Sequence, residues 1–198
     1  MISIIKEHEM ADYFDLLKTR RSIRDFEDKN VPLDIIRDII RESCLAPSSG
    51  NLQPWRFIII NDRALIKRLS DESKRNLVSY IERNPDAPER KYEDTLRNKH
   101  FNVFYNAPCL IYILGLKEIG SAQIDCALAA SYLMFSAAAR GLGTCWVALG
   151  KHIQDPGLLE EIGMPEDCKI VAPIIVGYPK SIPDVPERME PQILKTVT

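Results

Sequence analysis

Three arginines and a serine stand close together near the start of the chain, in the run Arg20-Arg21-Ser22-Ile23-Arg24. Guanidinium groups bind phosphate through paired, planar hydrogen bonds, so this run has the chemistry to hold a phosphorylated ligand. The alternative is that the same cations neutralise the C-terminus of a helix and lie in solvent, which is the more common role of a basic run. The run is therefore a candidate phosphate site that needs support from elsewhere in the chain.

A second polar stretch, Pro47 to Trp55, reads Pro-Ser-Ser-Gly-Asn-Leu-Gln-Pro-Trp. It is denser in polar side chains than turn chemistry requires, although a tight loop with Asx and Ser turns is an alternative explanation. The amides of Asn51 and Gln53 offer both donors and acceptors, which match the imide edge of a flavin or the edge of a base. This stretch is a candidate ligand-binding loop.

A third candidate is the segment from Gly141 to Gly150. Its G-x-G is not a dinucleotide-binding fingerprint, because a helix is expected before it and a strand after it, the reverse of the required order. The glycines are more simply a helix stop and a turn. The end of the segment could still offer backbone N–H groups to a ligand.

The remaining reactive side chains do not form a recognisable local motif. His8, His100 and His152 are far apart in sequence, so a zinc site is improbable. A Cys or Ser nucleophile with a His partner stays open, with no local support. The cysteines are scattered beside apolar runs, which indicates buried, reduced thiols; they are Cys44, Cys109, Cys126, Cys145 and Cys168.

The bulk composition is that of an ordinary globular domain. The 198 residues fit one domain, and a formal net charge of −2 gives no general reason to expect nucleic acid or an anionic membrane as a partner. The N-terminus, Met1 to Glu9, has too short an apolar run for a signal peptide. The longest apolar tract, Ala127 to Ala139, is shorter than a bilayer span. We therefore expect a cytoplasmic protein.

Hydrophobic periodicity and capping residues predict the elements that position these motifs. We expect apolar strands at 55–60, 108–114, 144–149 and 169–176, the first of them buried and the last at an edge or a bulge because of Pro173. Helices are expected at 12–18, from Pro32 to the polar loop, and at 62–83, 89–100, 121–140 and 156–162, while the proline-rich tail from Tyr178 has no core of its own.

Taken together, these motifs resemble those of the nitroreductase family of FMN-dependent oxidoreductases. The order and spacing match: the Arg20–Arg24 run, then Pro47–Trp55, then Gly141-Leu142-Gly143 after an alanine-rich helix, then Val176-Gly177-Tyr178-Pro179. The resemblance extends over nearly the whole chain, and Pro-Ser-Ser-x-Asn-x-Gln-Pro-Trp is its most specific part. It implies an α+β fold with a central, mostly antiparallel sheet flanked by helices, in a single domain over residues 1–198. It also implies an intertwined homodimer, with residues 178–198 as an extended tail across the partner subunit.

The resemblance also implies a flavin site made by two subunits. Arg20, Arg21 and Ser22 would hold the FMN phosphate, with Arg188 from the tail, and Arg24 would lie near the N1/O2 side of the ring. Negative charge gathers there when hydride arrives at N5, and a fixed cation would stabilise it. The other implied cofactor-binding residues are Pro47, Ser48, Ser49, Asn51 and Gln53 from the second subunit, and Ala148, Leu149 and Gly150 near N5 and the pyrimidine edge.

The implied activity is ping-pong hydride transfer from NADH or NADPH, through FMN, to a nitroaromatic, a quinone or a similar small acceptor. No side-chain acid or base is required for the hydride step. The same fold is also used for other flavin reactions such as reductive dehalogenation, so fold alone does not fix the substrate. A flavin-binding store or sensor without turnover, and a flavin-free structural dimer, are the alternatives.

Overall fold

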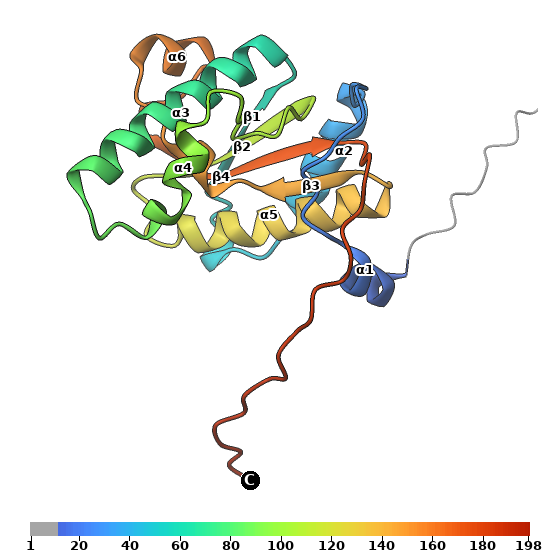
Figure 1. Ribbon diagram of the computed structural model, residues 1–198. Helices are drawn as coiled ribbons and strands as arrows, with labels where there is room; N and C mark the ends of the chain where they lie inside the picture. Colours follow the sequence, from blue (N-terminus) through green and yellow to red (C-terminus); the bar gives the residue numbers. More distant parts are fainter. Residues whose placement is uncertain (1–11) are drawn as a thin grey trace, which may run out of the picture.

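The computed structural model of the chain describes residues 12–198 (Figure 1). The predictions that concern Met1–Glu9, including the absence of a signal peptide and the isolation of His8, lie outside the described residues.

A four-stranded antiparallel sheet forms the centre of the fold, with strand order β1-β2-β4-β3. The strands are β1 (Trp55–Ile60), β2 (Cys109–Leu116), β3 (Gly143–Trp146) and β4 (Cys168–Gly177). All three strand pairs are antiparallel, which confirms the predicted α+β class and the antiparallel sheet.

Helices cover both faces of this sheet, as Figure 1 shows. On one face α2 (Leu33–Ser43) and α5 (Ala122–Ala139) pack over Ile111 and Ile113 of β2. On the other face α3 (Arg63–Arg83), α6 (Pro156–Glu161) and the segment around Phe104 pack over the alternate residues of the same strand. The described helices also include α1 (Tyr13–Thr19) and the short α4 (Glu93–Arg97).

Helix capping explains why several of these elements begin where the sequence predicts. The Asp12 carboxylate accepts hydrogen bonds from the amides of Phe14 and Asp15, and Asp62 caps α3 in the same way. Just after the C-terminal end of α5, Gly141 adopts a φ of 72°, the left-handed conformation that ends a helix. These boundaries are therefore set by local chemistry that is visible in the sequence.

Two predictions about the position of strands in the sheet were wrong. β1 lies at an edge of the described sheet, and only Trp55 and Ile60 are buried, so it is not the buried strand that its apolar run suggested. Pro173 lies in β4, which is central, so its assignment to an edge was wrong. The register of the β2–β4 pair shifts between Ala172 and Ile170, close to Pro173, so the bulge was the correct alternative.

Two further segments differ from the predicted elements. Residues 89–100 do not form one solvated helix: a 3-10 turn (Pro88–Tyr92) leads into the short α4, and Leu96 is buried against Leu77 and Ile81 of α3. The predicted strand 144–149 ends at Trp146, because the chain turns into a 3-10 helix, η3 (Ala148–Lys151). This second difference matters for function, since η3 carries three candidate site residues.

α5 is long and apolar enough to cross a membrane by length and composition alone. The membrane-span argument used only the apolar tract 127–139 and not the whole predicted helix 121–140, which the structure places at Ala122–Ala139. Core helices pass the same test, and α5 packs on the sheet through Ala129, Leu133 and Ala137. Its opposite side exposes Ile124, Leu128 and Tyr132, which follow one another at helical spacing as an apolar stripe.

The tail is held to the body as far as Ser181, through hydrogen bonds of Lys180 and Ser181 to Asp25, and then runs past α1 without regular structure (Figure 1). Its apolar side chains are exposed, including Ile193 and Leu194. The chain itself therefore provides no surface that covers them.

Candidate functional site

The first turn beyond α1 brings the predicted basic run against the sheet. Ser22 forms a bridge with Thr144 of β3, and the amide of Ile23 donates a 2.9 Å hydrogen bond to the Thr144 carbonyl. A Cβ on Gly143 would overlap the Ile23 side chain, so glycine is required for this close approach. The run is thus fixed on an edge strand and is not a solvated helix end.

Arg21 is buried, with only 9% of its surface exposed. Its Nη1 donates a 2.6 Å hydrogen bond to the Arg20 carbonyl, whereas Nε and Nη2 are buried without a partner among residues 12–198. A buried polar group without a partner is costly, and a charged one more so. The guanidinium therefore has two donors ready for an anion.

Arg20 lies within electrostatic reach of two other arginines, Arg21 and Arg188. The guanidinium of Arg20 is half-buried and stands 5.7 Å from the Phe135 ring centroid of α5. Burial, followed by the like charges of Arg21 and Arg188, lowers the pKa of Arg20. Within the described chain no carboxylate forms an ion pair with any of these three arginines. This cluster of Arg20, Arg21 and Arg188 is therefore a candidate anion site whose charge the described chain does not compensate.

Arg24 lies on the far side of the same turn and is exposed. Its guanidinium lies 5.7 Å from the ring centroid of Tyr105, close enough for a cation–π contact. Tyr105 and Asn106 both adopt a positive φ, and Asn102 hydrogen bonds to Asn106, so the loop is held in an unusual conformation. Sequence reasoning missed Tyr105, whose only signal was an aromatic residue among asparagines in a segment without clear periodicity.

The loop from Pro47 to Gln53 has the strained geometry typical of a binding loop. Gly50, Asn51 and Gln53 all have positive φ values, of 55°, 55° and 47°. The Ser48 hydroxyl accepts from the Gln53 amide, and the Gln53 side chain donates to the Asn51 Oδ1 at 3.0 Å. The side-chain amides therefore pair with each other here, while Pro47, Ser49 and Asn51 remain exposed.

This loop and the basic run lie at opposite ends of α5. The amide of Ser49 donates to Asp125 in the first turn of the helix, whereas Arg20 contacts Phe135, ten residues later. At 1.5 Å per residue these points are about 15 Å apart along the helix axis. One chain does not bring the two predicted halves of the site together.

The η3 turn packs through Gly150 on Phe104, the neighbour in sequence of the Tyr105 that Arg24 contacts. The carbonyl of Gly150 accepts from the buried Tyr112 hydroxyl at 3.1 Å, and the Leu149 carbonyl accepts from Ser73 of α3. A Cβ on Gly150 would come within 2.7 Å of Phe104 Cζ, so glycine is needed there too. Ala148 is exposed at the start of this rigid turn, where its backbone can meet a ligand.

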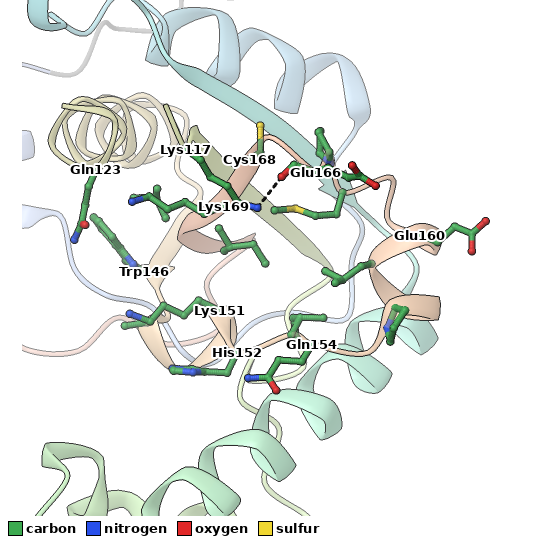
Figure 2. A pocket seen from close by; sticks show the side chains of 18 of the residues that line it. Lys117, Gln123, Trp146, Lys151, His152, Gln154, Glu160, Glu166, Cys168 and Lys169 are labelled. Atoms are coloured by element: carbon green, nitrogen blue, oxygen red, sulfur yellow. Dashed lines mark hydrogen bonds between the residues drawn. The ribbon is translucent and has the colours of Figure 1, made fainter. Parts of the chain in front are cut away.

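A cavity of about 980 Å³ opens beside Ala148. Figure 2 shows Trp146, Lys151 and His152 in its wall, none of which was a predicted site residue. Burial, and then the charge of Lys151, lowers the pKa of His152, against an opposing effect of Glu89. Trp146 is the last residue of β3, whereas Lys151 and His152 reach the cavity through the η3 turn, which the strand pattern did not predict.

The described cysteines do not form a nucleophilic site. Burial raises the pKa of Cys109 to about 12 and that of Cys126 to about 11. Burial also raises the pKa of Cys145, although Arg24 and Arg20 act in the opposite direction. These thiols are protonated at neutral pH and have the properties of apolar core residues.

The candidate site therefore combines a group of arginines, a rigid backbone turn and an adjacent cavity. The chain belongs to the nitroreductase family, whose sequence model matches residues 17–178.

The similar proteins include some named nitroreductase and others named deiodinase. The chain is 27% identical to an Archaeoglobus fulgidus protein named "Putative NADH dehydrogenase/NAD(P)H nitroreductase", over 88% of this chain and 90% of that one. It is also 25% identical to iodotyrosine deiodinase 1 of Sus scrofa, over 94% of this chain and 68% of the relative. A solved nitroreductase from Bacteroides fragilis with bound FMN has the same fold, with a TM-score of 0.78, 21% identity, and coverage of 95% and 100% of the two chains.

The residues present fit FMN on an observation independent of these names. FMN carries one phosphate, and the Arg20–Arg21–Arg188 cluster presents guanidinium donors without partners. Two of the donor nitrogens, Nε and Nη2 of Arg21, are buried. Ala148 and Arg24 are both exposed, and the Phe104–Tyr105 segment contacts η3 and Arg24, so the ring could lie near both if Arg24 faced its N1/O2 edge.

Proposed function

We propose that the protein is an FMN-dependent oxidoreductase that takes hydride from NADH or NADPH and passes electrons to a nitroaromatic, quinone or similar small acceptor. The proposal rests mainly on one observation, the buried Arg21 with two unpartnered nitrogens beside Arg20 and Arg188. A monoanionic or dianionic phosphate would satisfy these donors and compensate their charge.

Bound FMN would supply the hydride chemistry, and the chain would bind and orient it. Arg20, Arg21, Ser22 and Arg188 would hold the phosphate. Arg24, supported by the Tyr105 ring, would present a positive charge to the pyrimidine side. The η3 backbone at Ala148, Leu149 and Gly150 would contact the ring near N5, held by the Tyr112 and Ser73 hydrogen bonds.

We propose further that the working form is an intertwined homodimer. The apolar stripe of Ile124, Leu128 and Tyr132 on α5 is exposed, as are Tyr13 and Phe14 of α1. Apolar side chains grouped on one face are typical of an interface. A partner would cover that stripe, and residues 178–198 would extend across it.

A dimer would also complete the binding site. In one chain, about 15 Å along α5 separate the basic run from the loop that carries Pro47, Ser48, Ser49, Asn51 and Gln53. In the dimer this loop would approach the flavin held by the other subunit. We propose a cytoplasmic location for this assembly.

Reductive dehalogenation is the second candidate reaction, favoured by the similarity to iodotyrosine deiodinase. It would use the same flavin site and differ only in the bond that is reduced in the acceptor. Steady-state turnover of a nitroaromatic or quinone against an iodinated aromatic, with one electron donor, separates the two.

The absorbance spectrum of the purified protein tests the proposal itself. We expect the visible flavin bands before addition of NADH or NADPH, and their bleaching afterwards. Flavin bands that no nicotinamide bleaches would support a non-catalytic flavin store instead. Colourless protein that FMN does not stabilise thermally would support a flavin-free structural dimer.

A further inference from the structure

The cavity beside η3 is separate from the arginine cluster and carries its own positive charge. Three lysines line it: Lys117 after β2, Lys151 at the end of η3 and Lys169 in β4. Lys117 donates a 2.6 Å hydrogen bond to the backbone carbonyl of Glu166. The side-chain ammonium groups of Lys151 and Lys169 make no hydrogen bond or ion pair with any residue between 12 and 198.

The carboxylates of the lining do not neutralise these lysines. Glu160 of α6 is on the rim, and its side chain points away from the cavity in Figure 2. Glu166 meets Lys117 through its backbone and not through its carboxylate. Folding therefore leaves at least two ammonium groups in this cavity available to a ligand.

An aromatic side chain, Trp146, lines the same cavity as these two ammonium groups. Trp146, at the end of β3, is partly exposed to the cavity. In Figure 2 the side chains of Lys151 and Lys169 flank its indole, and Gln123 of α5 lies on the same side. A planar ring could stack on the indole while an anionic substituent reached a lysine, since aromatic faces and point cations provide those two contacts.

We propose that this cavity binds the electron acceptor, and that the acceptor is a planar aromatic ring carrying a carboxylate. The inference rests on the proposed function, because Ala148 in the cavity wall is the residue expected beside flavin N5. The volume of about 980 Å³ is at the upper end of the range for small-molecule sites. None of its lining residues is an arginine, so the bidentate forks that suit phosphate are confined to the other part of the site.

Two matched ligands test the charge preference without turnover. 4-Nitrobenzoate and the neutral 4-nitrobenzamide are titrated by calorimetry into the FMN-loaded protein in the absence of reductant. We expect the benzoate to bind about tenfold more tightly, the effect of one or two partly exposed charge contacts. Equal affinity of the two ligands, or no binding of the benzoate, overturns the proposal.

Variants then assign the preference to this cavity. Lys151 and Lys169 are exposed, so a Lys151→Gln/Lys169→Gln double variant should fold normally. It should bring the affinity ratio of the two ligands close to one while the affinity for the benzamide stays constant. Lys91→Gln/Lys99→Gln removes the same two charges from exposed lysines outside the cavity and should leave the ratio unchanged. A preference that survives in the double variant overturns the proposal.

Turnover distinguishes this proposal from failure of the proposed function. With NADH as donor, the double variant should raise KM for 4-nitrobenzoate by about tenfold and leave the rate of flavin bleaching by NADH unchanged. If the double variant instead slows bleaching and keeps its KM for the benzoate, the cavity serves the donor and the proposal is wrong. If NADH and NADPH fail to bleach the wild-type protein, the proposed function fails, while the calorimetric comparison still tests the cavity.

Discussion

Replacing Arg21 with methionine should stabilise the protein without FMN and destabilise its complex with FMN. Arg21 is buried, and its Nε and Nη2 have no partner within the described chain. A methionine of similar length fills the same space without carrying charge or donors. The expected effects on the apo protein and on the complex therefore have opposite signs, which few structural substitutions produce.

The magnitudes follow from the contacts of Arg21. Relief of buried unsatisfied donors should contribute about 1–3 kcal/mol, and loss of the 2.6 Å bond to the Arg20 carbonyl should cost about 1 kcal/mol. The net gain of about 0–2 kcal/mol corresponds to a Tm increase of up to roughly 8 °C for a chain of this size. Loss of a hydrogen bond to a charged phosphate, at about 1.5–3 kcal/mol, should weaken FMN binding by roughly 10- to 150-fold.

The assay is thermal unfolding of the apo protein at one fixed protein concentration, together with an FMN titration by quenching of flavin fluorescence. Arg37→Met is the control, because Arg37 is an exposed arginine on α2 away from the site. It should change neither Tm nor FMN affinity appreciably. A lower apo Tm for Arg21→Met with unchanged FMN affinity would refute the phosphate role and leave Arg21 as a structural residue.

Three further predictions concern other parts of the site and the assembly. Gly150→Ala should cost about 1–3 kcal/mol of unfolding free energy, because its Cβ would overlap Phe104. Gly120→Ala has open space around it and should cost under about 0.5 kcal/mol. Equal denaturant midpoints for the two variants would contradict this prediction. Leu128→Lys should convert a dimer to monomer in light scattering, since a charge on the apolar stripe of α5 opposes its burial, and an unchanged dimer mass would place the interface elsewhere. Burial lowers the pKa of His152 below its unfolded value. The contribution of neutral His152 to stability is therefore complete above about pH 6.5 and is lost as the pH falls through the lowered pKa. His152→Gln should reduce the fall in Tm on acidification, and an unchanged dependence of Tm on pH would contradict this prediction.

Features that depend on local chemistry could be predicted from the sequence. The helix beginning after Asp62 and the helix end at Gly141 follow from a capping carboxylate and a left-handed glycine. The antiparallel α+β fold followed from the resemblance, whose most specific part is Pro47–Trp55. These features require no knowledge of distant contacts.

Features that depend on tertiary neighbours could not be predicted. Trp55–Ile60 is as apolar as a central strand, and only its place in the strand order makes it an edge. Leu96 gives little periodicity in a charged segment, yet it is buried because α3 lies above it. The end of β3 at Trp146 is likewise set by Ser73 and Tyr112, which hold the η3 turn from other elements.

The candidate site divides in the same way. The identity of the basic run was visible in the sequence, but the burial of Arg21 and the absence of partners for it were not. The lysines of the cavity were equally hidden, because Lys117, Lys151 and Lys169 come from three separate segments.

The most direct measurement of the central claim is the visible absorbance spectrum of the purified dimer or monomer, recorded without oxygen before and after addition of NADH and then NADPH. The account predicts flavin bands in the purified protein, or after reconstitution with FMN, that bleach with at least one nicotinamide and return when a nitroaromatic or quinone is added. A protein that neither retains nor takes up FMN would contradict the claim that Arg20, Arg21 and Arg188 form a flavin phosphate site.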